Sequence, residues 1–236
     1  MFDKILFDLD GTLTDPKIGI TTCVQYALKH FGIEEDIEKL TPFIGPPLID
    51  SFMEFYGFTL EQAREATDVY RERFAPIGKF ENEVYRGIPE MLSTLKQAGI
   101  TLAVASSKPE KFVNEILEHF DLLKYFDVVV GSLMNETRTK KEEVLEEALI
   151  RLKVPYSGSL EYPLSDERSV RIEIEKESIA MVGDRKFDVA SARDMGITAV
   201  GVRFGYADEG ELEAENPDYI ANDVSELTQF LVHNKR

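Results

Sequence analysis

Cysteine and histidine are scarce in this sequence. Cys23 is the single cysteine, so the chain can form no internal disulfide and no thiolate metal cluster. It lies in the helix-like stretch ITTCVQYAL, where a packing role is expected. The three histidines, His30, His119 and His233, are scattered near expected helix ends and are interpreted as structural or surface residues. A metal site would therefore have to be built from oxygen ligands.

Long hydrophobic runs and excess positive charge are missing as well. No stretch approaches the roughly 18 consecutive apolar residues of a membrane-spanning helix, and the acidic N-terminus does not resemble a signal peptide. We therefore expect a cytoplasmic protein without a membrane partner. With 44 acidic against 27 basic residues, the net charge is −17, which argues against nucleic acid as a partner. An anionic substrate would need a local cation, such as a bound metal.

Length and composition predict a globular protein with one or two domains. The chain has 236 residues, of which 43% are hydrophobic and 30% charged. An apolar strand, KILF at 4–7, opens the chain, and from residue 84 onward short apolar runs alternate with helical patterns. Expected strands cover 100–106, 126–132, 178–184, 197–202 and 218–220, and expected helices cover 109–120, 140–152, 186–196, 209–215 and 224–232. This alternation indicates an α/β fold with right-handed βαβ units and a mostly parallel sheet.

The segment 16–83 has a different character. Amphipathic helix patterns at 16–32, 47–57 and 59–76 follow one another without a comparable strand between them. This indicates a helical module inserted after the first strand of the α/β core. The expected domains are a core made of residues 1–15 and 84–236 and a helical domain made of residues 16–83.

Reactive side chains are expected together at one edge of the sheet, because parallel strands place functional groups at their carboxyl ends. Such residues follow each of the first four expected strands: Asp8 and Asp10, then Ser106, then Lys140 and Lys141, and last Asp184 and Asp188. Each alone has an ordinary explanation, such as a turn, a helix cap or a solvated face. Their common edge and their order favour a functional site.

Clustered carboxylates repel one another, so a site of this kind is unstable unless a cation neutralises it. Oxygen ligands favour Mg²⁺, whose coordination is commonly completed by a substrate phosphate. Asp8 could then attack phosphorus and become an aspartyl phosphate, while Asp10 protonates the leaving oxygen and later activates water. Ser106 could donate a hydrogen bond to a phosphoryl oxygen, and a lysine could offset negative charge.

Four short motifs resemble those of the haloacid dehalogenase superfamily. DLDGTLTD is similar to its first motif, VASSKP to its second, RTKKEEV to its lysine-bearing third and GDRKFD to its fourth. In addition, LFDLDGTLTDPKIGI, FIGPPLIDSFMEFYG and ENEVYRGIPEMLSTLK resemble phosphoglycolate phosphatase-like enzymes, which are often labelled 5′-nucleotidases. The resemblance implies a phosphoric monoester hydrolase. Its fold would be a three-layer, Rossmann-like core with a helical cap inserted after the first strand and closing over the site.

The resemblance also implies a role for each matching residue. Asp8 would be the nucleophile and a ligand of Mg²⁺. Asp10 would be the general acid and base and would give the metal its backbone carbonyl. Asp184 would bind the metal, and Asp188 would bind it directly or through water. The phosphate-binding residues implied are Gly11, Thr12, Ser106, Ser107 and a lysine of the third motif.

Two features of the sequence leave alternatives open. Lys140 and Lys141 point about 100° apart on a helix, so only one can face the site, and alignment of KEEV with similar sequences favours Lys141. The segment 154–178 is longer than the connection that relatives use at this place. Its VRIEIEK alternates apolar and polar residues, so the segment is interpreted as a β-hairpin or as an acidic loop.

Several activities fit the same motifs. The expected function is Mg²⁺-dependent hydrolysis of a small phosphorylated metabolite, such as phosphoglycolate, a nucleoside monophosphate or a sugar phosphate. The alternative within the superfamily is a phosphomutase, which uses the same aspartate pair. A dehalogenase lacks the second aspartate, and a phosphonatase needs a cap lysine that the sequence does not identify. A receiver domain would be much shorter, and a silent binding protein would not need every reactive position. A monomer or a weak homodimer is expected.

Overall fold

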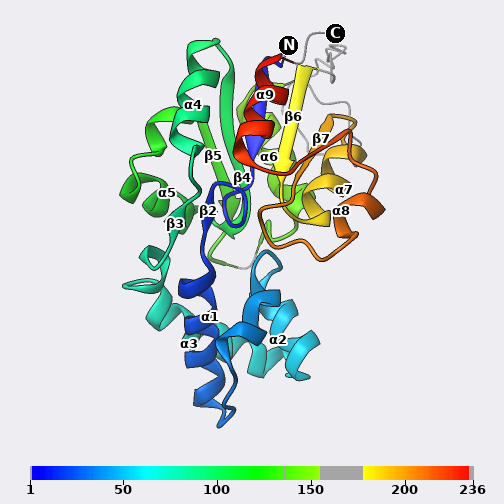
Figure 1. The fold of residues 1–236 in the computed structure, drawn as a ribbon. Coiled ribbons are helices and arrows are strands. Elements are labelled where there is room, and N and C mark those ends of the chain that lie inside the picture. Colours follow the sequence, from blue (N-terminus) through cyan, green and yellow to red (C-terminus); the bar gives the residue numbers. More distant parts are fainter. Residues whose placement is uncertain (1, 136, 155–177, 234–236) are drawn as a thin grey trace, which may run out of the picture.

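The computed structural model describes residues 2–135, 137–154 and 178–233 (Figure 1). These residues form a six-stranded sheet in the order β5-β4-β1-β6-β7-β8, in which all neighbouring strands are parallel. Its strands are β1 Lys4–Phe7, β4 Thr101–Pro109, β5 Val128–Ser132, β6 Ile179–Gly183, β7 Thr198–Val202 and β8 Tyr219–Ala221. Each strand expected from the sequence is present, and the predicted α/β fold is confirmed.

Helices cover both faces of this sheet, which makes three layers (Figure 1). One face packs against α4 Ile88–Gln97, α5 Glu110–His119 and α9 Val224–His233. The other packs against α6 Lys141–Arg151, α7 Lys186–Asp194 and α8 Glu211–Ala214. Along β1, Ile5 and Phe7 enter the first core and Leu6 enters the second, as the alternation of side chains in a strand requires. Because both faces are covered, the strand is a continuous apolar run.

Local sequence accounts for the start and the buried side of these helices. Gly87 adopts φ 93°, a conformation that suits glycine, and Pro89 stands in the first turn of α4, where its missing N–H is not needed. On α6, Val144 and Ala148 lie one helical turn apart and are both fully buried. An apolar stripe of this kind is what seats a helix on a sheet.

A helical part lies beyond the carboxyl ends of the strands (Figure 1). Its helices are α1 Lys17–His30, α2 Leu48–Tyr56, α3 Leu60–Phe74 and the 3-10 helix Ile37–Phe43. At the start of α3, the Thr59 hydroxyl accepts the Gln62 N–H and the Gln62 side chain accepts the Thr59 N–H. The helices enclose a core of their own that includes Phe43, Phe52 and Phe74. The predicted helical cap after the first strand is therefore confirmed.

Two short strands connect the sheet with the helical part. β2 Thr14–Asp15 and β3 Glu83–Val84 pair antiparallel where the chain leaves and re-enters the core. The sequence patterns do not predict these two strands, since two residues carry no measurable period. The patterns also do not predict helix α4. The domain boundaries beside this pair stay a prediction. The hairpin or loop expected within 154–178 falls on 155–177, outside the described residues.

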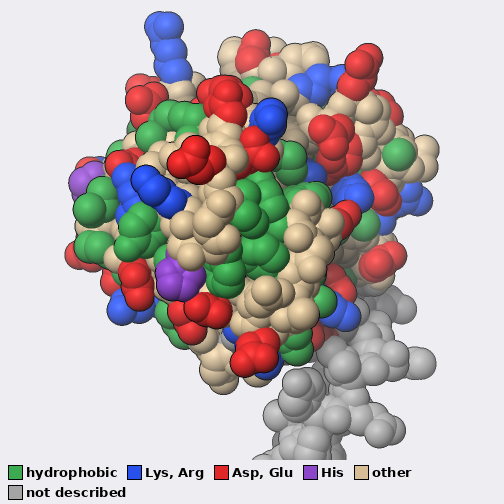
Figure 2. Space-filling view, turned by 90° about the horizontal axis from the view of Figure 1, so that it is seen from below, with side chains coloured by type: hydrophobic (Ala, Val, Ile, Leu, Met, Phe, Trp, Pro, Cys, Tyr) green, Lys and Arg blue, Asp and Glu red, His purple; other side chains and the backbone are tan. Residues whose placement is uncertain are grey.

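The helical end of the molecule has a mixed surface. Figure 2 looks onto this end and shows hydrophobic side chains gathered near the middle of the face, among acidic and basic ones. Acidic groups are frequent there, as the net charge of −17 leads one to expect. Within the described part of the chain, no helix is long and apolar enough to cross a membrane.

Leu92 tests the first core, because its side chain lies fully buried between α4 and the sheet. We expect Leu92→Ala to lower the free energy of unfolding by about 2–5 kcal/mol, through lost apolar burial and the cavity that remains. Urea unfolding followed by circular dichroism measures this change. The exposed Gln97 on the same helix is the control, and Gln97→Ala should stay within about 0.5 kcal/mol of the wild type. Equal effects of the two substitutions would contradict the assigned packing.

Candidate active site

The carboxyl edge of the sheet faces the helical part (Figure 1), and several residues with carboxylate, hydroxyl or ammonium groups lie at this edge. Asp8 directly follows β1, Asp184 directly follows β6, and Ser106 lies within β4. Asp188 lies in the first turn of α7, and Lys141 begins α6. Between 1% and 5% of each residue is exposed. The fold thus brings together side chains that are far apart in the sequence.

Three carboxylates form the centre of the site. Asp8, Asp184 and Asp188 each place one carboxylate oxygen in the cluster, and these three oxygens lie within 4.8 Å of one another. Burial raises the pKa of Asp184 well above its usual range, and the charges of Asp188 and Asp8 raise it further. Burial also raises the pKa of Asp188 to about 6, against the opposing charge of Lys141. The three groups form a cluster of like charges that a cation would stabilise.

Lys141 supplies positive charge to this cluster. Its Nζ lies 3.0 Å from Asp8 Oδ2 and 2.8 Å from Asp188 Oδ1, and it donates to the Ala105 carbonyl at 3.0 Å. Burial by itself would lower the pKa of Lys141, but the charges of Asp188 and Asp8 outweigh it and raise the pKa above its usual range. Lys140 is exposed. Of the two adjacent lysines, the structure therefore places Lys141 at the carboxylates.

Backbone packs directly against two of the carboxylates. A Cβ on Gly11, whose φ is +78°, would lie 2.0 Å from Asp184 Oδ2. A Cβ on Gly205 would lie 2.3 Å from Asp184 Cβ, and one on Gly183 would lie 2.1 Å from Asp188 Cγ. These glycines let the chain approach the carboxylates more closely than any other residue would. A compact set of carboxylate oxygens fits a small, hard divalent cation.

The residues expected to bind phosphate take different positions around the cluster. The Thr12 hydroxyl donates to Asp184 Oδ1 at 3.3 Å, and Gly11 backs onto the same side chain. The Ser106 hydroxyl accepts the backbone N–H of Lys108 at 3.4 Å. Ser107 lines a cavity beside the site. Thr12 therefore holds a carboxylate in this structure, while phosphate binding by these residues stays a prediction.

Asp10 lies apart from the three clustered carboxylates. Its Oδ2 pairs with Lys108 Nζ at 2.6 Å, while its Oδ1 has no hydrogen-bond partner among the described residues. Burial raises the pKa of Asp10, and Lys108 opposes that rise. Lys108 Nζ also lies 4.7 Å from the centre of the Phe74 ring of α3. The motif reading missed Lys108, although a lysine just behind Ser106 in VASSKP is a visible signal.

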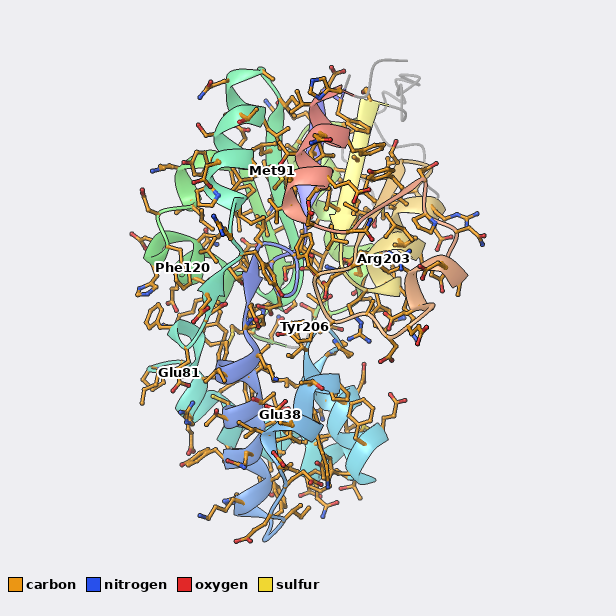
Figure 3. All side chains as sticks on the ribbon, in the orientation of Figure 1. Glu38, Glu81, Met91, Phe120, Arg203 and Tyr206 are labelled. Carbon is orange, nitrogen blue, oxygen red and sulfur yellow. The ribbon has the colours of Figure 1, made fainter. Side chains whose placement is uncertain are left out.

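Arg185 and Tyr206 connect the site with the helical part of the molecule. Arg185 Nη1 donates to the Ile44 carbonyl at 2.7 Å. Tyr206 donates its backbone N–H to Asp184 Oδ2 at 2.8 Å and its hydroxyl to Asp15. Figure 3 shows Tyr206 at the junction of the sheet and the helices. Sequence reasoning missed both contacts, because their partners are remote in the chain.

Fold and site together describe a three-layer α/β protein with a buried acidic cluster, the candidate active site, at the carboxyl edge of the sheet beside a helical cap. The model of the haloacid dehalogenase-like hydrolase family matches residues 5–202, and the chain belongs to this family. The predicted membership of this superfamily is confirmed, and with relatives named 5′-nucleotidase and phosphoglycolate phosphatase the predicted phosphatase class is confirmed as well.

Individual relatives match over most of the chain. A 5′-nucleotidase from Pseudomonas aeruginosa is 43% identical over 231 residues, which are 98% of this chain and 96% of the relative. The tyrosine-protein kinase PtkA from Mycobacterium tuberculosis is 36% identical over 203 residues, which are 86% of this chain and 62% of that protein. The crystal structure of a predicted phosphatase from Clostridium acetobutylicum is 41% identical with a TM-score of 0.87, covering 98% of this chain and 99% of that one.

Asp184→Asn should stabilise the protein when divalent cations are absent. The pKa of Asp184 is raised in the folded state above its ordinary 3.8. The wild type therefore loses stability as the pH rises from the ordinary pKa of the unfolded chain to the raised pKa of the folded state. A neutral side chain removes this loss. We therefore expect a higher Tm for the variant in EDTA at pH 8, by about 2–4 °C for each kcal/mol gained, and a smaller difference at pH 4.

The same variant tests cation binding without any activity measurement. Adding Mg²⁺ at pH 8 should raise the Tm of the wild type, since binding stabilises the folded state, and should raise that of Asp184→Asn much less. Asp208 is exposed, so Asp208→Asn should respond like the wild type. An equal response of all three proteins would show that the carboxylates hold no cation.

Proposed function

We propose that this protein is a Mg²⁺-dependent phosphomonoester hydrolase that works through an aspartyl phosphate on Asp8. The observation that carries the proposal is the buried cluster of Asp8, Asp184 and Asp188 with Lys141 against it. A buried carboxylate beside a lysine, in a site able to hold a cation, suits attack on an anionic phosphoryl group. The family assignment supports this reading.

Two half-reactions complete the proposed cycle. An oxygen of Asp8 attacks phosphorus, the bond from phosphorus to the ester oxygen breaks, and Asp10 gives the leaving oxygen a proton. Asp10 next takes a proton from water, the water oxygen attacks phosphorus, and the bond to Asp8 breaks to release phosphate. Burial raises the pKa of Asp10, the direction that suits a general acid, while Lys108 opposes that rise.

The other residues of the site would bind the phosphoryl group and offset its negative charge. Lys141, at 3.0 Å from Asp8 Oδ2, would offset the negative charge that Asp8 and the phosphoryl group bring together. Ser106 would donate its hydroxyl to a phosphoryl oxygen, with Gly11, Thr12 and Ser107 nearby. A divalent cation here would be held by Asp8, Asp184 and Asp188 and by the Asp10 backbone carbonyl. Mg²⁺ would supply charge neutralisation and orient the phosphate.

The substrate of this proposal is a small phosphorylated metabolite. The name of the Pseudomonas aeruginosa relative, 5′-nucleotidase, supports a nucleoside monophosphate, while phosphoglycolate and sugar phosphates remain the other candidates. The helical part formed by residues 16–83 would act as the cap over the substrate. A phosphomutase remains the alternative, because it would use the same Asp8 and Asp10. A cytoplasmic location and a monomeric or weakly dimeric state stay predictions of the sequence.

Asp8→Asn should abolish turnover, because an amide cannot act as an anionic nucleophile. Phosphate release from p-nitrophenyl phosphate with Mg²⁺ measures the rate. Mass spectrometry of acid-quenched wild type should find phosphate on Asp8. Near-native turnover by Asp8→Asn, or phosphate trapped on another residue, would contradict the proposed mechanism.

Asp10→Asn should lower kcat by about 10²–10⁴ for an alkyl phosphate, the usual size of a general acid and base contribution. The loss should be smaller for p-nitrophenyl phosphate, since nitrophenolate leaves without a proton. Measuring kcat for both substrates tests this difference. Equal losses for both would argue that Asp10 has a role other than proton transfer to the leaving group.

The adjacent lysines provide a matched pair. Lys141→Ala should lose most of kcat, because it removes the ammonium beside Asp8, whereas Lys140 is exposed and Lys140→Ala should change kcat little. Steady-state kinetics on one phosphate ester, with circular dichroism as a check of folding, distinguishes the two. The reverse ranking would contradict the role proposed for Lys141.

A further inference from the structure

A cavity of about 280 Å³ adjoins Asp10. It lies where the helical part meets the carboxyl edge of the sheet, with Asp10, Ser107 and Lys108 on the sheet side and Tyr70 and Phe74 of α3 on the other. This volume corresponds to about nine molecules of liquid water, so it exceeds what a glycolate leaving group fills. A leaving group that is expelled toward Asp10 would occupy this space.

Aromatic side chains make up much of the wall. Phe43, Tyr70, Phe74 and Phe112 all line the cavity, and each is at most 4% exposed. Tyr70 stacks on Phe74 with ring centroids 5.1 Å apart, and Phe74 meets Phe112 edge to face at 5.3 Å. Rings held in this way form a rigid apolar surface. Such a surface favours a flat ring over a strongly hydrated chain or sugar.

The cations at the cavity already face carboxylates. Lys108 Nζ lies 2.6 Å from Asp10 Oδ2, and Arg71 Nη1 lies 3.8 Å from Asp68 Oδ1. Asp50 also lines the cavity and adds negative charge. Among the described lining residues there is thus no basic side chain without an acidic neighbour. A second anionic group on the substrate would have to compete with these carboxylates for the two cations and would meet the charge of Asp50, which disfavours a carboxylate or a further phosphate.

Tyr70 carries the one aromatic hydroxyl among the described residues of this wall. It is 4% exposed, and its hydroxyl has no hydrogen-bond partner among residues 2–135, 137–154 and 178–233. Burial, followed by the neighbouring Cys23 and Asp10, raises the pKa of Tyr70 well above its usual range, so the hydroxyl stays protonated. The hydroxyl oxygen is not one of the fully enclosed polar atoms without a partner among the described residues, so it is accessible from the cavity that Tyr70 lines. A neutral donor or acceptor on a ligand would satisfy it.

We infer that the substrate is a nucleoside 5′-monophosphate, with its nucleoside in this cavity and a neutral hydrogen-bonding atom of the nucleoside on the Tyr70 hydroxyl. The base packs among the aromatic rings, and the single phosphate reaches Asp8. This inference rests on the proposed phosphatase function and adds the substrate class. It makes Tyr70 a specificity-determining residue and excludes phosphoglycolate as the preferred substrate.

Matched substrates test the inference. Uridine 5′-monophosphate and ribose 5-phosphate share the phosphorylated ribose and differ in the base, whose stacking is expected to raise kcat/KM about tenfold or more. Phosphoglycolate should be a poorer substrate than either. Equal kcat/KM for the first two would overturn the assignment in favour of a sugar phosphate. A preference for phosphoglycolate would overturn it in favour of a small carboxylate.

Tyr70→Phe removes the hydroxyl and keeps the ring. We expect the ratio of kcat/KM for uridine 5′-monophosphate to that for p-nitrophenyl phosphate to fall about fivefold, the effect of one lost hydrogen bond. The matched control is Tyr26→Phe, since Tyr26 is 46% exposed on α1 and outside this cavity. Its ratio should not change. An unchanged ratio in Tyr70→Phe would overturn the role of Tyr70.

Binding separates this inference from the proposed reaction. Asp8→Asn, in which the nucleophile is absent, should bind uridine 5′-monophosphate in isothermal titration calorimetry with Mg²⁺ more tightly than it binds ribose 5-phosphate. If the wild type hydrolyses no phosphate ester yet this preference is found, the proposed function fails and the nucleotide site stands. If esters are hydrolysed without this preference, the proposed function stands and the inference fails.

Discussion

The electrostatic repulsion among Asp8, Asp184 and Asp188 is the constraint on which this structure depends. Three carboxylates with oxygens within 4.8 Å of one another are buried at the end of an apolar sheet, where their charges are poorly screened. Lys141 offsets part of that charge from a different element, at 2.8 Å from Asp188 and 3.0 Å from Asp8. The cores on both faces of the sheet must supply the stability that this arrangement removes.

Several contacts between the sheet and its helical cap lie at the site, while others, such as the ion pair of Lys79 with Glu115 on α5, lie away from it. Arg185, next to Asp184, donates to the Ile44 carbonyl, and Lys108, paired with Asp10, lies over the ring of Phe74. A movement of the helices relative to the sheet would therefore disturb groups that touch the reactive carboxylates. In this arrangement, the shape of the cavity beside Asp10 and the position of Asp10 depend on the same side chains.

Much of the fold and of the site could be predicted from the sequence. Apolar runs locate the strands, and a parallel sheet forces Asp8 and Asp184 to the same edge because each follows a strand. The same reasoning fails for β2 and β3, which are too short to show a period. Helical pattern alone does not choose between Lys140 and Lys141. The resemblance of KEEV to similar sequences favours Lys141, and the structure places Lys141 Nζ beside Asp8 and Asp188.

The sequence by itself determined the class of enzyme, because strand ends, helix starts and the four motifs are local properties of the chain. Only the tertiary structure decided which groups touch. Lys108 reaches Asp10, Thr12 reaches Asp184, and Tyr70 faces a cavity closed by residues from several other elements. Distances between remote residues depend on how helices pack on the sheet. Periodicity states which side of an element is buried but not which partner it meets.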